Sequence, residues 1–195
     1  WKDHLWGYFS YGKNQIDIIR LTQSPDKTTL ENITAKVNWQ ATESDAVSYF
    51  FFHPSKVKIG RPTGVEGTID SDEHLRDQGN AWPAQPHGFH KLEWNRIWGP
   101  NIISNLKFAR FNTGFTLAPR VPGEDETIDF RVNQSRGGAV DARFERPQTT
   151  FRGDVSYFTT ALGGSHELKI GAGWKKAEAD SFNITSGRKV QQRIN

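Results

Sequence analysis

The sequence predicts an all-β protein whose strands run antiparallel, up and down, in chain order. Three observations indicate this fold class. Aromatic residues make up 12% of the 195 residues, with 13 Phe and 7 Trp, and aromatic side chains favour strands. Several segments alternate apolar with polar residues, the pattern of a strand with two different faces. Between these segments lie short stretches of Gly, Pro, Asn, Asp and Ser, the residues that tight turns require.

The first two expected strands lie near the N-terminus. Residues 4–12 have strand composition, although their inner and outer sides are not decided by the pattern. The second is expected at residues 29–41, and its positions 32–41 alternate most clearly, because Ile33, Val37 and Trp39 have one parity, while Asn, Thr, Lys and Gln have the other. Successive side chains of a strand point to opposite faces, so this strand has one apolar and one hydrogen-bonding face.

Three expected strands follow, at residues 46–58, 87–97 and 102–113. The first has high β-propensity but carries aromatic residues on both faces. In the second, Leu and Trp94 alternate with Lys and Glu, so the two sets point to opposite faces. In the third, Leu and Phe108 alternate in the same way with Asn and Lys. Both patterns are those of half-apolar strands.

The last two expected strands are 149–160 and 166–176. In the first, Val155 shares its parity with Phe151 and Tyr, against Arg, Asp and Ser. In the second, Leu168, Ile, Ala and Trp alternate with Glu, Lys and Gly. Both are therefore expected to have one apolar face.

The connections between these seven segments alternate strictly in length. Three are short and three are long: the short ones are 42–45, 98–101 and 161–165, and the long ones are 13–28, 59–86 and 114–148. All short turns therefore fall at one end of an up-and-down sheet. Long connections are uncommon in compact domains, whereas outer-membrane barrels combine short periplasmic turns with long extracellular loops. The sequence predicts part of a transmembrane β-barrel of the bacterial outer membrane.

The tryptophans fit this interpretation. Trp39 precedes the first short turn and Trp98 begins the second, while Trp174 stands about ten residues from its own short turn, which suits the opposite interface. In barrels such residues form aromatic girdles at both membrane surfaces. The alternative is that the same residues fill a soluble core.

Other protein classes find less support. The longest strongly apolar run, 46–52, is far shorter than the ~18 residues of a spanning helix, so transmembrane helices are excluded. There is no Cys, and 25 basic against 22 acidic residues give a net charge of +3. Both signs are interleaved, which argues against a nucleic-acid partner. Neither a nucleophile elbow nor a phosphate-binding loop occurs, so an enzyme is not expected.

The chain resembles a known family in its patterned strands. TLENITAKVNWQAT (29–42) with SDAVSYF (44–50) looks like a barrel strand, turn and strand of TonB-dependent receptors, specifically the Oar-like group with a carboxypeptidase-regulatory domain. SHELKIGAGW (165–174) is similar to another of their strands, and KDHLWGYF (2–9) looks like a strand after the plug. The resemblance covers most of the chain but includes no catalytic motif.

This resemblance implies a plugged barrel of 22 strands that imports a scarce substrate with energy delivered by TonB. The implied partners are outer-membrane lipid, the protein's own plug domain, TonB through a missing N-terminal part, and an unknown small-molecule, glycan or peptide substrate. No TonB box or plug is found, there is no Met at the start, and the end lacks a terminal aromatic residue. We therefore expect residues 1–195 to be an internal piece, a partial barrel domain of about seven to eight strands with the plug and remaining strands absent.

Ligand contacts are expected in the second and third long loops, where aromatic and Arg side chains could contact sugars, carboxylates or peptides. The candidates are Trp82, His87, His90, Arg120, Arg131, Arg136 and Arg143. No metal or cofactor is expected, because His87 and His90 differ in parity on a strand, and Asp70-Ser-Asp-Glu lacks the later residues of a calcium loop.

The alternative hypothesis is a secreted or soluble β-sandwich that binds carbohydrate through Trp82, Trp94 or Trp174. Strands with two different faces would serve that fold equally well.

Overall fold

The computed structural model describes residues 3–19, 25–61, 69–70, 76–80, 87–119, 126–129, 134–136, 140–185 and 189–192. These residues form strands, with one 3-10 turn at Ala161–Gly163 and no α-helix. No helix in the described parts of the chain is long and apolar enough to cross a membrane. The strands are β1 (Leu5–Ile19), β2 (Pro25–Gln40), β3 (Asp45–Arg61), β4 (Ile69–Asp70), β5 (Arg76–Asn80), β6 (Gly88–Gly99), β7 (Ile102–Asn112), β8 (Gly114–Pro119), β9 (Glu126–Asp129), β10 (Gln134–Arg136), β11 (Val140–Glu145), β12 (Gln148–Thr159), β13 (His166–Ala177), β14 (Asp180–Thr185) and β15 (Lys189–Gln192).

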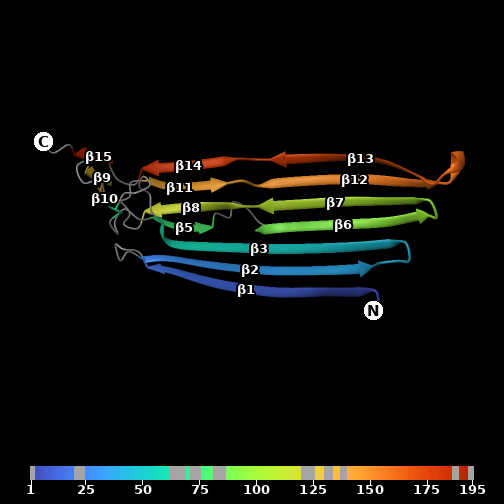
Figure 1. The fold of residues 1–195 in the computed structure, drawn as a ribbon, viewed down its shortest axis with the longest axis horizontal. Helices are drawn as coiled ribbons and strands as arrows, with labels where there is room; N and C mark the ends of the chain where they lie inside the picture. The colour runs from blue at the N-terminus through green and yellow to red at the C-terminus, as the bar shows by residue number, and fades with distance from the viewer. Residues whose placement is uncertain are drawn as a thin grey trace.

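One large antiparallel sheet contains eleven of the described strands. Toward the short turns its order is β1-β2-β3-β6-β7-β12-β13, which is also the chain order of these strands. Beyond the middle of the sheet β3 pairs with β5, and the order continues β5-β8-β11-β14. Figure 1 shows these four shorter strands prolonging the lines of β6, β7, β12 and β13. The prediction of an all-β, antiparallel fold is confirmed.

The short turns join β2 to β3, β6 to β7, and β12 to β13 at one end of the sheet (Figure 1). The predicted long loops need correction, because strands occupy part of each. β1 continues to Ile19 and β2 begins at Pro25, while β4, β5, β8, β9, β10 and β11 lie in the other two. The hydrogen-bond ladder satisfies the backbone groups of these segments whether or not their side chains alternate.

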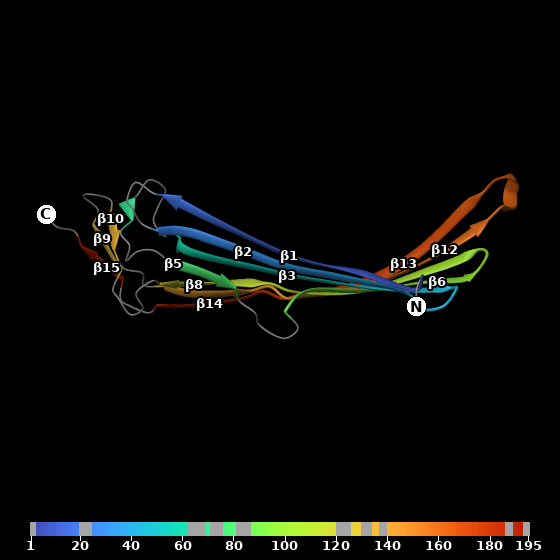
Figure 2. The same ribbon diagram turned by 90° about the horizontal axis from the view of Figure 1, so that it is seen from below.

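The large sheet is a single twisted layer, and within the described residues it does not close on itself. β1 and β13 lie at opposite edges, and Figure 2 shows that they slope in opposite directions along the sheet. A separate four-stranded sheet, in the order β15-β9-β10-β4, lies beyond the end opposite the short turns (Figure 1). It includes two parallel pairs, β15 with β9 and β10 with β4.

The described part of the chain has almost no apolar core. Ala142 is its one buried apolar residue, whereas Val37, Trp39, Leu168 and Ile170 are 45%, 42%, 62% and 77% exposed. No second sheet covers the apolar side of these strands within the described residues. Within the described residues, these side chains are therefore not enclosed between two sheets.

A row of strand interruptions lies near the middle of the sheet, where β6 meets β5, β7 meets β8, β12 meets β11 and β13 meets β14, whereas β1, β2 and β3 run on without a break. The backbone N–H of Arg146 donates to the carbonyl of Thr113 at 2.8 Å, and that of Glu178 donates to the carbonyl of Pro147 at 3.0 Å. Pro147 has no N–H to give to the ladder. Gly88, at the start of β6, has a positive φ of 86°. We call this row the crease; it separates the half near the short turns from the other half.

Candidate functional site: the two faces of the sheet

The pairing register gathers the apolar side chains of seven strands on one face of the sheet. Trp39 on β2 pairs with Val47 on β3, which pairs with Trp94 on β6, and that residue pairs with Leu106 on β7. Paired residues share a face. By this register the apolar band consists of Leu5, Phe9, Tyr11, Ile33, Ala35, Val37, Trp39, Val47, Tyr49, Phe51, Leu92, Trp94, Leu106, Phe108, Phe151, Val155, Tyr157, Leu168, Ile170, Ala172 and Trp174.

Polar residues bound the apolar band on each strand. On β13 the same face carries His166 before the apolar residues and Lys176 after them. These two positions are about 33 Å apart along a strand. With a tilt of about 40° that length spans about 25 Å, the height of the apolar belt of a membrane barrel.

On the side away from the short turns, the bounding residues form a line across the sheet. Lys13 and Glu31 on β1 and β2 form an ion pair of 2.7 Å. The line continues with His53, His90, Arg110, Thr149 and Lys176. This border follows the pairing register from β6 to β13, but it steps by two residues between β2 and β3 and again between β3 and β6, because His53 pairs with Ile33 and His90 with Phe51.

Indole groups stand near both borders of the band. Trp98 lies at the short-turn end, where its Nε1–H donates to Ser104 Oγ at 2.9 Å and the guanidinium of Arg96 lies 4.2 Å from its ring centre. Trp39 lies at the same end, opposite Leu5 of β1. Trp174 lies toward the other end, paired with Phe151. The role of these three residues as aromatic girdles stays a prediction.

At the β2–β3 turn, Asp45 connects the band to the polar border. Its carboxylate accepts hydrogen bonds from Thr42 Oγ1 at 2.7 Å and from Trp94 Nε1 at 2.9 Å. The hydrogen bond from Thr42 is the main reason that the pKa of Asp45 is lowered; Trp94 and the charge of Arg96 act in the same direction, while partial burial opposes them.

The opposite face of the sheet is polar and charged. On β6, Glu93 accepts a hydrogen bond from Asn105 Nδ2 at 2.9 Å and pairs with Lys91 at 2.8 Å and Lys107 at 3.3 Å. On the neighbouring strands Lys169 pairs with Asp154 at 2.9 Å, and Ser156 Oγ donates to Glu167 at 2.8 Å. Interleaved charges of both signs need water or further polar groups around them.

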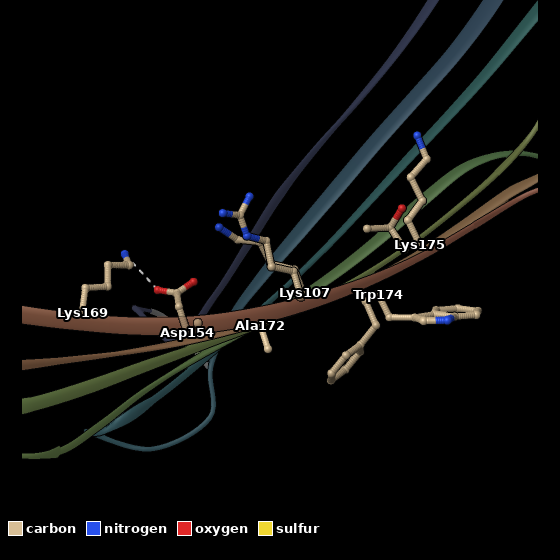
Figure 3. A pocket seen from close by; sticks show the side chains of 11 residues that line it. Lys107, Asp154, Lys169, Ala172, Trp174 and Lys175 are labelled. Carbon is tan, nitrogen blue, oxygen red and sulfur yellow. Dashed lines mark ion pairs between the residues drawn. The ribbon is translucent and has the colours of Figure 1, made fainter.

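An open recess of about 710 Å³ lies on this face, over β7, β12 and β13. Figure 3 shows Lys107, Asp154, Lys169 and Lys175 on one side of the β13 ribbon, with Ala172 and Trp174 on the other. The sequence interpretation did not identify this recess. The sequence does contain a sign of it: Gly171 and Gly173 alternate with apolar residues along β13, so two successive positions of the polar face have no side chain.

Nearer the crease the polar face also carries aromatic rings. Phe89 contacts Phe50 and Phe111 edge-on, with ring centres 6.0 and 5.9 Å apart. The aromatic residues on both faces of 46–58 are thus explained, because one set lies in the apolar band and the other in this cluster.

Of the predicted ligand residues, Trp82, Arg120 and Arg131 lie outside the described residues. Arg136 is the last residue of β10, and its side chain is not described. His87 directly precedes β6, which contains His90, while Arg143 lies on β11 and pairs with Glu145 of the same strand.

The ring of His90 contacts the backbone of His87, three residues earlier in the chain. His90 Nε2 lies 2.8 Å from the carbonyl oxygen of His87, and its Nδ1 lies 2.6 Å from the hydroxyl of Tyr49. Both ring nitrogens of His90 are therefore engaged. The pKa of the nearby His53 is lowered, mainly by burial and then by the charges of His87 and His90.

No group of three metal-ligating side chains occurs among the described residues. Asp70 belongs to β4, and the acidic residues after it lie outside the described part.

Comparison of the chain with protein-family models, curated proteins and solved structures finds no match.

Proposed function

We propose that the chain forms part of the wall of a bacterial outer-membrane β-barrel, a TonB-dependent receptor of the Oar-like kind that imports a scarce substrate. One observation carries this proposal: an exposed apolar band crosses seven neighbouring strands, directly behind a charged face. Monomeric soluble proteins rarely expose apolar patches larger than a few hundred Å². In a bilayer the same band faces acyl chains, and the charged face lines a hydrated lumen.

The band supports a membrane-facing role more than a sandwich. In a sandwich Val37, Leu168 and Ile170 would be covered by a second sheet. Here they are between 45% and 77% exposed. The carbohydrate-binding sandwich stays the second candidate only if another layer, outside the described residues, covers this face.

The open edges support the same proposal. β1 and β13 each pair on one side within the described sheet. Unpaired backbone groups cost several kcal/mol each in lipid, so a membrane wall of this kind needs further strands to close it. The resemblance supplies the other proposed partners: a plug in the lumen, TonB beneath it, and a substrate contacted by Trp82, Arg120, Arg131 and Arg136.

Two single-cysteine variants test which face meets lipid, because the chain has no cysteine of its own. Val37→Cys lies on the apolar face and Lys36→Cys on the polar face of the same strand. Each variant is labelled with an environment-sensitive fluorophore and refolded into vesicles whose acyl chains carry bromine. We expect strong quenching at position 37 and weak quenching at position 36. Equal quenching at the two positions would refute the proposal.

A further inference from the structure

We propose that the recess over β7, β12 and β13 binds a small polyvalent oxyanion, a solute with several phosphate or carboxylate groups. The inference rests on the proposed function, in which the polar face lines a water-filled lumen, and it names the chemical class of a solute bound there.

The recess exists because β13 has no side chains at two successive positions of its polar face. Gly171 and Gly173 lie there, between Lys169 and Lys175. A Cβ at Gly171 would lie 3.0 Å from both Asp154 Cβ and the carbonyl oxygen of Gly153. Side chains at these positions would fill the space, so the two glycines keep it open.

Cations dominate the lining of this space. Lys107, Arg152, Lys169 and Lys175 line it together with one carboxylate, that of Asp154. Lys169 pairs with Asp154 at 2.9 Å, and Lys107 pairs with Glu93 at 3.3 Å outside the recess. The charge of Glu167 also acts on Lys169.

Two cations of the lining, Arg152 and Lys175, form no ion pair or hydrogen bond within the described structure, although Arg152 lies within electrostatic range of Asp154. Arg152 occupies the middle of a cross-strand row, with Lys107 on one side and Gly173 on the other. Lys175 lies on the same side of the sheet, as Figure 3 shows. The recess thus holds an excess of positive charge that the described residues do not neutralise.

An oxyanion with several charged groups matches this arrangement. A guanidinium presents two parallel N–H donors to phosphate or carboxylate oxygens, and an ammonium adds a point charge. Rings of Arg and Lys select anions and phosphate in pores. A volume of about 710 Å³ is within the usual range of small-ligand sites. A neutral sugar would gain nothing from the unpaired charges.

The test measures binding by calorimetry, with the protein in detergent micelles and pyrophosphate, citrate or glucose as the titrant. We expect pyrophosphate and citrate to bind and glucose not to bind. The double variant Arg152→Gln/Lys175→Gln should lower the affinity for both anions by about 10-fold or more, because it removes the two positive charges that form no ion pair within the described structure. Arg152→Lys should retain most of the affinity.

Lys36→Gln is the control, because it removes one positive charge from the polar face of β2, outside the recess. It should leave anion affinity unchanged, and circular dichroism should show equal β-sheet content in all variants. Equal affinity of the double variant and the parent, or equal weakening by the control, would overturn the proposal. The fluorophore pair at positions 36 and 37 reports on the membrane wall separately, so failure of one proposal is distinguishable from failure of the other.

Discussion

Gly88 shows how a single residue determines the local structure at the crease. Its φ of 86° lies in the left-handed region, which glycine adopts without the steric cost of a Cβ. A Cβ at this position would also lie 2.6 Å from the carbonyl oxygen of Phe52. β6 can therefore begin beside β3 only with glycine at this point.

We predict that Gly88→Ala destabilises the folded chain by about 1–3 kcal/mol through this backbone strain. Gly99→Ala, at the other end of β6, is the control, since nothing lies within 4 Å of the position that its Cβ would occupy. Urea unfolding in detergent micelles, followed by circular dichroism, measures both variants. Similar unfolding midpoints for the two variants would contradict the prediction.

A second residue-scale prediction concerns Asp45 and acid. Its pKa is lowered in the folded chain, first by the hydrogen bond from Thr42, so the folded state binds protons less readily than the unfolded state. The stabilisation is present above the ordinary pKa of an aspartate, about 3.9, and is lost as the pH falls through the lowered value.

We therefore expect Asp45→Asn to reduce the difference in unfolding midpoint between pH 7 and pH 3. Glu43→Gln, in the same turn, is the comparison variant. A pH dependence that is identical in the parent and Asp45→Asn would show that the Thr42 contact contributes nothing to acid sensitivity.

Individual strands differ in how far the sequence predicts them. β2 and β13 follow from alternation alone, because their apolar side chains share one face and their polar side chains the other. β5 could not be found in this way, since Arg76–Asn80 contains no apolar residue. β14 does alternate, with Phe182 and Ile184 at every second position. Its six residues are too few for this alternation to identify a strand from the sequence. Backbone pairing with a neighbour, and not side-chain burial, defines such strands.

The two faces of β2 give an element-scale prediction. Val37→Lys places a charge in the apolar band, where the cost at the bilayer centre is about 2–4 kcal/mol. Asn38→Lys adds the same charge on the polar face and should change stability far less. Refolding yield and unfolding midpoints in lipid vesicles give the comparison. Equal losses for the two variants would mean that the faces are not distinguished by the bilayer.

At the scale of the whole molecule, the sequence predicted the seven long strands and the gathering of all short turns at one end. It did not predict the second half of the sheet, which lies within the expected loops. It also missed the recess, because cross-strand register is needed to bring Lys107 of β7 beside Arg152 of β12 and Gly173 of β13. A one-dimensional pattern shows which residues share a strand face but does not show which strands are neighbours.

We predict that the chain does not form a stable monomer in plain buffer, since its apolar band and two sheet edges would be exposed to water. In detergent micelles it should acquire β-sheet content and a cooperative unfolding transition. Analytical ultracentrifugation and circular dichroism, with and without detergent, measure this. A monomeric, cooperatively melting species in buffer alone would contradict both the prediction and the proposed function.

The lack of a covering layer has a consequence for how this chain can change over time. Leu168 and Ile170 are 62% and 77% exposed, so a methyl group gained or lost at either position leaves no cavity and meets no neighbouring side chain among the described residues. Only polar or charged substitutions at these positions would reduce the stability of the folded chain. Homologous chains should therefore keep the alternation of apolar and polar positions along these strands after their sequence identity has become low.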